Sequence, residues 1–169
     1  IDTGISNTHP DLLANVKGGV NTIRPGKSWN DDNGHGSHVA GTVGALNNTI
    51  GVVGVGPAAD LYAIKVLSAG GSGYLSDVIE GIEWGVNNGT DVLNMSLGTT
   101  SNIQSFHDVV TAAYNAGVVL VAAAGNSATN TDNYPHYPSS YQADNLLSVA
   151  AIDNKDGLAS FSNYGAKSV

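Results

Sequence analysis

The chain has 169 residues, 41% hydrophobic and 12% charged, so it is long enough to bury a core and too apolar for a disordered tail. Its net charge of -8, with only six Lys and Arg residues, disfavours binding to nucleic acid, because phosphate neutralisation needs clustered cations. No apolar run reaches the roughly 18 residues of a membrane span. We therefore expect one domain over residues 1–169, with neither a nucleic-acid nor a membrane partner.

The predicted elements alternate between strands and helices. Strands are expected to end at Ile1 and to cover part of 18–34, 61–67, 92–96, 118–123 and 146–152. Helices are expected at about 35–46, 75–86 and 103–116, the second from the three-and-four spacing of its apolar residues. The run at 118–123 is continuous and apolar, as in a strand buried on both faces of a sheet, and 146–152 is expected to form another buried strand. The alternation predicts an α/β fold, a three-layer sandwich whose mostly parallel sheet is covered by helices on both faces.

The most informative stretch runs from Asp31 to Ala45, where a glycine-lined loop leads His35 onto the start of a helix. Small residues of that helix, Ala40, Gly41, Gly44 and Ala45, predict close packing against a sheet. Histidine titrates near neutral pH and commonly shuttles a proton to and from a nucleophile.

Two other positions could complete such a site. Asp2 follows a strand end, and Asn126 follows an apolar run. In parallel sheets, functional groups collect at the carboxyl ends of the strands, where these residues and Ser96 are expected. Taken singly, each of them is also an ordinary turn residue.

Together, these stretches resemble a known family. Asp2-Thr3-Gly4, His35-Gly36-Ser37-His38-Val39-Ala40-Gly41-Thr42 and Ala123-Ala124-Gly125-Asn126 resemble the aspartate, histidine and oxyanion-asparagine motifs of the subtilisin-like serine proteases. The resemblance implies that His35 is the general base and then the general acid, that Asp2 orients it, and that Asn126 stabilises the oxyanion.

The family's nucleophilic serine stands in a Gly-Thr-Ser-Met-Ala motif downstream of the asparagine, and these 169 residues contain no such motif. We therefore expect a partial subtilisin-like catalytic domain over residues 1–169, incomplete at both ends and inactive alone. The resemblance implies that the full-length parent is a secreted, extracellular serine endopeptidase.

Further segments resemble the family's substrate-binding parts. Gly71-Ser72-Gly73 resembles the family's edge segment that pairs with an extended substrate. Two other segments, Ser96-Leu97-Gly98 and Ala123-Ala124-Gly125, resemble the walls of the family's primary specificity pocket. Small residues expose main chain to such pairing. The resemblance implies a monomer that binds protein or peptide substrates in extended form, with a mainly apolar or aromatic preference. Without it, these are ordinary glycine-containing loops.

A calcium site is also expected. The segment from Leu46 to Val52 resembles the family's calcium loop, which uses oxygen ligands of the kind calcium requires. The resemblance implies five ligand residues in this chain: Asp11, Leu46, Asn48, Ile50 and Val52.

His38 is not expected to bind a metal, because the helical zinc motif places its histidines four residues apart with a glutamate beside the first. We interpret His38 as a packed or hydrogen-bonded helix residue.

Two alternatives remain open from the sequence. The first is a noncatalytic relative of the family, a pseudoprotease or binding module that keeps the cleft without the serine. The second is a flavodoxin-like or nucleotide-binding α/β protein, which fits the fold but for which the chain has no phosphate loop after its first strand.

Overall fold

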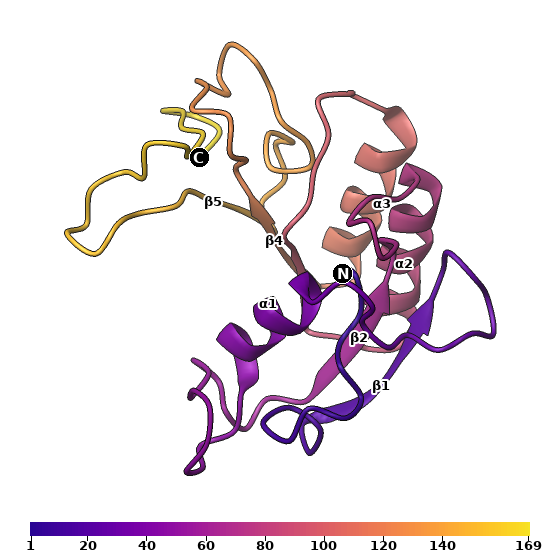
Figure 1. Cartoon of the computed structure of the whole chain (residues 1–169). Helices are drawn as coiled ribbons and strands as arrows, with labels where there is room; N and C mark the ends of the chain where they lie inside the picture. The colour runs from indigo at the N-terminus through magenta and orange to yellow at the C-terminus, as the bar shows by residue number, and fades with distance from the viewer. The chain divides into compact units, whose positions relative to one another are not determined.

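The computed structural model describes all residues, 1–169, and contains three helices and five strands (Figure 1). In chain order these are β1 (Val16–Asn21), α1 (His35–Gly44), β2 (Leu61–Lys65), α2 (Leu75–Asn87), β3 (Val92–Met95), α3 (Gln104–Asn115), β4 (Val119–Ala123) and β5 (Leu146–Val149). The chain divides into two compact units, Ile1–Trp84 and Gly85–Val169, and each has a sheet of its own.

The sheet of the first unit is built around β2. β1 pairs with β2 in parallel, with Asn21 opposite Lys65, and Thr22 donates its N–H to the Lys65 carbonyl. Asp2 also bridges Lys65 in parallel, but it bonds to the Ile64 carbonyl and the Val66 N–H instead. Alternate backbone groups of a strand point to opposite sides. The Asp2 segment therefore lies along the edge of β2 that β1 leaves free.

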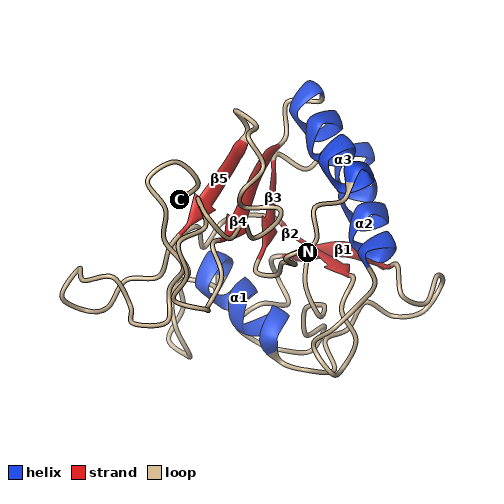
Figure 2. Ribbon diagram, turned by 90° about the horizontal axis from the view of Figure 1, so that it is seen from above, coloured by secondary structure: helices blue, strands red, loops and turns tan.

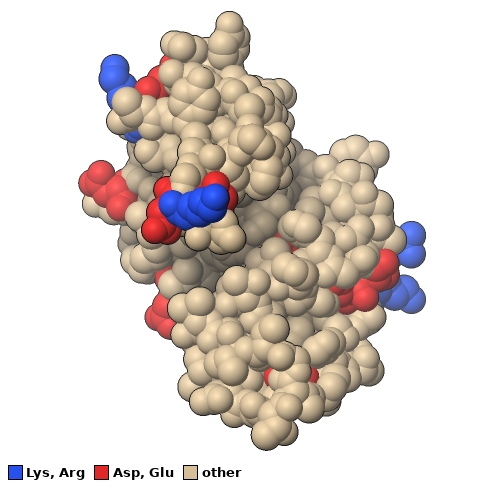
Figure 3. Space-filling view, turned by 60° about the vertical axis from the view of Figure 1, so that its left-hand side comes forward, with Lys and Arg blue, Asp and Glu red and all other residues tan.

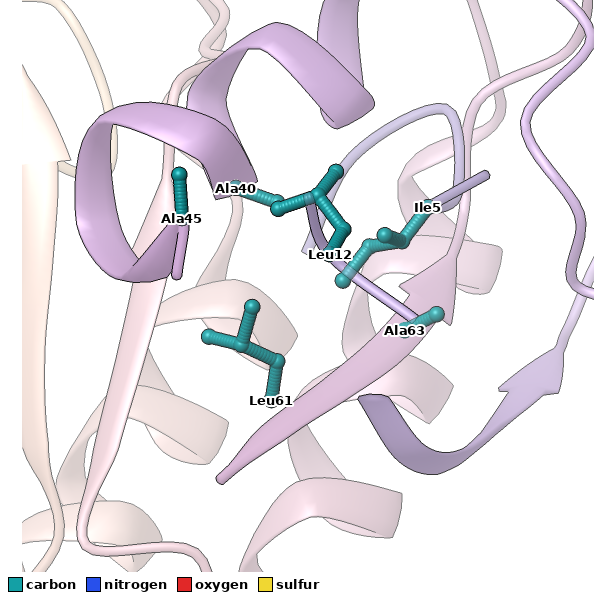
Figure 4. Close-up of a cluster of buried hydrophobic side chains, with 6 residues drawn as sticks. All are labelled: Ile5, Leu12, Ala40, Ala45, Leu61 and Ala63. Carbon is teal, nitrogen blue, oxygen red and sulfur yellow. The ribbon is translucent and has the colours of Figure 1, made fainter. Parts of the chain in front are cut away.

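One cluster in the core of the first unit contains six buried apolar residues, seen in Figure 4: Ile5, Leu12, Ala40, Ala45, Leu61 and Ala63. α1 contributes only small side chains to it. A Cβ added to Gly44 would lie 3.2 Å from a Leu61 methyl group, so the helix approaches β2 closely there. The expected close packing is not found at Gly41, where no atom lies within 4 Å of an added Cβ.

The sheet of the second unit has the order β3-β4-β5, and all its pairings are parallel (Figure 2). One face is buried, with Met95, Leu120 and Ala122 almost inaccessible. α3 packs along β4 and buries Phe106 and Val110 completely. Amphipathic periodicity in α3 and alternation in the strands produce this packing.

The opposite face of this sheet corrects one prediction. The runs at 118–123 and 146–152 are not buried on both faces, since Val119 is 37% exposed, Leu147 56% and Val149 49%. The registers place these side chains, with Val92, on one face of the sheet. α3 covers the other face, and nothing in the second unit buries this one, so the continuous apolar run does not translate into burial on both faces.

The parallel pairings and the alternation of helices with strands confirm the predicted α/β fold class. Observed boundaries differ from the expected ones by a few residues; α1, for example, ends at Gly44 rather than near residue 46. None of the three helices has the length and apolar character needed to span a bilayer. On the face shown in Figure 3, charged side chains form small, separate groups on a largely uncharged surface.

Candidate active site

Asp2 is a buried carboxylate, 6% exposed, held between the backbone of β2 and its own loop. Its N–H donates to the Ile64 carbonyl at 3.0 Å, and its carbonyl accepts from Val66 at 2.9 Å. The Thr3 N–H donates to Asp2 Oδ1 at 2.7 Å. These contacts fix the direction of the Asp2 side chain independently of His35.

His35 is the first residue of α1. The preceding Gly34 has a φ of 108°, in the left-handed region that favours glycine, and it turns the chain into the helix. The His35 N–H donates to Asn33 Oδ1 at 3.0 Å, which closes the turn before the helix. The side chain of His35 is about half-exposed.

The structure brings Asp2 and His35 into direct contact. His35 Nδ1 lies 2.7 Å from Asp2 Oδ1 and 2.9 Å from Oδ2. Because an ionised carboxylate only accepts hydrogen bonds, Nδ1 carries the proton and donates it, and Nε2 of the neutral ring has a free lone pair. An imidazole held in this tautomer can take a proton at Nε2.

Thr3 and Gly36 join the two sides of this pair. The Gly36 N–H donates to Thr3 Oγ1 at 2.9 Å. A Cβ on Gly36 would clash with the Gly4 carbonyl oxygen, so only glycine permits α1 to begin this close to the Asp2 loop. Neither contact was predicted from the sequence.

Lys65 is a buried cation beneath the Asp2 loop. Its ammonium donates to the Thr3 carbonyl at 2.6 Å, the Leu67 carbonyl at 2.9 Å and Asp32 Oδ1 at 2.7 Å. All three of its protons have acceptors, which offsets the cost of burying the charge. Lys65 thereby ties the backbone at Thr3, directly after Asp2, to the backbone at Leu67, whose N–H donates to the Asp2 carbonyl.

The segment 71–73 is an exposed turn in the first unit. Ser68 donates its N–H to the Ser72 carbonyl at 2.9 Å, and Gly71 adopts a φ of 76°. Asn33 Nδ2 donates to the Ala69 carbonyl at 2.8 Å. The turn is thus tied to the loop that carries His35.

Asn126 is exposed in the second unit, in a loop that follows β4. Asn163, which is buried, organises this loop: its Oδ1 accepts from Ser127 N at 2.9 Å and Thr129 N at 3.2 Å. Its Nδ2 donates to the Ala124 carbonyl at 2.8 Å, and its N–H to the Gly125 carbonyl at 2.9 Å. No local sequence pattern points to Asn163, because its partners lie 34 or more residues away.

His136 connects the two segments predicted to form pocket walls, 96–98 and 123–125. Its ring leaves no room for a Cβ on Gly98 and lies beside Gly125. Thr99 and Tyr137 form an antiparallel bridge next to it, with N–H to O distances of 2.8 and 2.7 Å. Burial lowers the pKa of His136 below its usual value, and a hydrogen bond to the Ala123 backbone only partly offsets this. No motif in the sequence points to this histidine.

Asp11 is 2% exposed and is enclosed by the segment 46–52. Its Oδ1 accepts from Asn48 Nδ2 at 2.8 Å, and its Oδ2 from Val52 N at 3.1 Å. The Asp11 carbonyl accepts from Leu46 N at 3.0 Å, and Asn48 Oδ1 from Ile50 N at 2.8 Å. All five residues expected as calcium ligands therefore belong to one hydrogen-bonded loop.

His38 is exposed on α1, so it is not packed, but it is a hydrogen-bonded helix residue through its backbone, since its N–H donates to the Gly34 carbonyl at 3.0 Å. It lies one turn after His35 and two residues before the buried Ala40, on nearly the opposite side of the helix from that core residue. Its backbone carbonyl accepts from Thr42 Oγ1 at 3.2 Å.

Comparison with known proteins identifies the family of this chain. The model of the Subtilase family matches residues 1–168. The chain is 50% identical over 165 residues to a thermostable alkaline protease of Halalkalibacterium halodurans, covering 98% of this chain and 44% of that protein. It is 49% identical over 166 residues to subtilisin Savinase of Lederbergia lenta (98% and 59%), and 50% identical over 169 residues to subtilisin DY of Bacillus licheniformis (99% and 60%).

The chain thus spans between 44% and 60% of the length of these three relatives. The match nevertheless runs through every segment discussed above, from Asp2 to Asn163. The chain belongs to the Subtilase family.

Proposed function

We propose that this chain is part of the catalytic domain of a serine endopeptidase that hydrolyses peptide bonds in proteins. The observation that carries the proposal is the Asp2–His35 hydrogen bond of 2.7 Å, formed within a chain that matches the Subtilase family over residues 1–168. The nucleophile is a serine outside these 169 residues.

In the proposed mechanism, His35 Nε2 takes the proton of the serine hydroxyl as the serine attacks the scissile carbonyl. Asp2 accepts the hydrogen bond from Nδ1, keeps the ring in the required tautomer and stabilises the imidazolium. His35 then gives the proton to the leaving amine, and water hydrolyses the acyl-enzyme by the same steps. The half-exposed ring of His35 supports this role, because Nε2 must reach both serine and substrate.

Asn126 supplies the oxyanion donor in this proposal. Its side-chain amide would donate to the negative oxygen of the tetrahedral intermediate, a charge that develops only in the transition state. Two features support it: Asn126 is exposed, and Asn163 holds the loop around it by accepting two hydrogen bonds and donating two. A donor that is already in place costs little reorganisation during the reaction.

The proposed substrate is a protein or peptide chain bound in extended form by a monomeric, secreted enzyme. The exposed main chain at 71–73 supports pairing with such a substrate, and the segments 96–98 and 123–125 would enclose one of its side chains. The acidic net charge of -8 supports neither a nucleic-acid nor a membrane partner.

We also propose that the loop around Asp11 binds a structural calcium ion. The residue types fit such an ion, since the buried Asp11 carboxylate lies beside a short loop whose main-chain carbonyls and Asn48 side chain offer further oxygens. In this structure the Asp11 oxygens accept from Asn48 Nδ2 and Val52 N. Asp11 and Asn48 would contribute side-chain oxygens, and Leu46, Ile50 and Val52 carbonyl oxygens. The ion would supply a charge that fixes the loop, with no part in proton transfer.

The direct test is to express the complete coding region and treat the product with a serine-directed organophosphonate. We expect covalent labelling that disappears in His35→Ala and persists in His38→Ala, a matched exposed histidine on the same helix. A product that folds but never labels, or a coding region without the serine, would instead establish a noncatalytic binding module.

A further inference from the structure

Asp31 is a carboxylate whose two oxygens accept five hydrogen bonds from three segments of the first unit. Oδ1 accepts from Thr3 Oγ1 at 2.8 Å, Asn33 N at 3.0 Å and Gly34 N at 2.9 Å. Oδ2 accepts from Ser37 N at 2.9 Å and Ser37 Oγ at 2.6 Å. Every donor is an uncharged N–H or O–H group, so these contacts fix the position of the Asp31 carboxylate and do not pair it with a cation.

The partners of Asp31 adjoin both members of the Asp2–His35 pair. Asn33 and Gly34 form the loop directly before His35, and Ser37 lies in the first turn of α1 directly after it. Thr3 follows Asp2, and its N–H donates to the Asp2 carboxylate. One carboxylate thus fastens the Asp2 loop to the start of the helix that carries His35.

Resting on the proposed function, we infer that Asp31 is a positioning residue that sets the distance and angle between Asp2 and His35. It acts through Thr3 on one side and through the 33–37 segment on the other, and it touches neither substrate nor the reacting atoms.

The protonation of Asp31 agrees with this role. Burial alone would raise the pKa of Asp31, but hydrogen bonds from Gly34, Ser37 and Asn33 outweigh it and hold the pKa well below its usual range. The Asp31 carboxylate therefore stays ionised at every pH at which a neutral histidine can act as a general base. An uncharged amide cannot replace it, because asparagine offers one acceptor oxygen and its NH₂ group would face donors.

Its neighbour Asp32 has a different function. The Asp32 carboxylate extends to the Lys65 ammonium at 2.7 Å and is half-exposed, so it forms an ion pair and does not hold the loop. The two adjacent acids are therefore not interchangeable.

The test uses the full-length protein that contains this chain, with Asp31→Asn, Ser37→Ala and Ser37→Thr, and with the exposed Asp144→Asn as the matched control for charge. Steady-state kinetics on a peptide substrate give kcat and KM. A ¹⁵N-edited proton spectrum gives the resonance of the His35 Nδ1 proton, and circular dichroism gives the folded fraction of each sample.

For Asp31→Asn, we expect kcat to fall about 10- to 100-fold with KM within about twofold, because a catalytic group displaced by about 1 Å loses about that much rate. The Nδ1 proton resonance should shift upfield or broaden. Ser37→Ala should lose less, Ser37→Thr should behave as wild type because it keeps the hydroxyl, and Asp144→Asn should change nothing. If Asp31→Asn does not fold, the Ser37 pair decides by the same two readouts.

Wild-type kcat and an unchanged resonance in folded Asp31→Asn would overturn the inference. So would a loss of kcat that only follows the folded fraction, or equal losses in Ser37→Ala and Ser37→Thr. Failure of the proposed function looks different: the wild type would neither cleave peptide nor label, while the resonance would still report whether Asp31 holds the pair together.

Discussion

Gly36→Ala should displace His35 from Asp2 without any change to a polar group. Gly36 is buried in the first turn of α1, and an added Cβ would lie about 1 Å closer to the Gly4 carbonyl oxygen than Cβ atoms normally approach. Backbone blocks the Cβ on that side, so α1 must move away from the Asp2 loop. We expect a loss of about 1–3 kcal/mol in the free energy of unfolding, typical of overpacking, and about a 10²-fold fall in kcat for a shift of about 1 Å.

Gly41→Ala is the matched control on the same helix. An added Cβ there meets no atom within 4 Å, so the exchange should stabilise α1 by up to about 1 kcal/mol through helix propensity and leave kcat unchanged. The assay is guanidinium unfolding together with peptide hydrolysis by the full-length protein. If the two variants are equally stable and equally active, a Cβ at residue 36 does not push α1 away from the Asp2 loop.

Three further predictions concern stability. The lowered pKa of His136 means that the unfolded chain binds its proton more tightly, so this contribution to stability is complete above pH 6.5 and decreases as the pH falls through the folded pKa. Unfolding of wild type and His136→Gln between pH 7.5 and 5 should show a smaller pH dependence in the variant; the idea fails if both curves have the same slope. Asn163→Ala leaves the Ser127 and Thr129 N–H groups and the Ala124 carbonyl without partners, and it should cost about 2–4 kcal/mol in urea unfolding; a loss below about 1 kcal/mol would contradict this. Calcium at about 100 times its Kd should stabilise the folded protein by about 2.7 kcal/mol in thermal unfolding. Asp11→Ala should abolish this effect, and the control Asp60→Ala, which removes the exposed ion pair with Lys17, should retain it. No response to calcium in the wild type would rule out the site.

Much of the fold was predictable because local pattern and tertiary packing agree. The helix expected at 103–116 and the strand expected at 118–123 agree with α3 and β4 within one or two residues. Burial was less predictable. The valines at 119 and 149 are as apolar as their buried neighbours, and only the registers and the position of α3 determine which face is covered.

The Asp2–His35 pair was anticipated because each residue stands in a short motif that resembles the family. Their supports were not, because hydrogen-bond partners far apart in sequence leave no local pattern. Asp31 and Thr3 are 28 residues apart, and Asn163 and Ala124 are 39 apart. His38 shows the opposite case, since a histidine within a motif turned out to be an exposed helix residue.

The kcat of Asp2→Asn in the full-length protein would show most directly whether Asp2 orients His35 for proton transfer. The amide keeps the shape of the carboxylate but can donate to Nδ1, which favours the wrong tautomer of His35. We predict that kcat falls by about 10⁴-fold while KM changes little. A folded Asp2→Asn variant with kcat within about tenfold of wild type would contradict the claim.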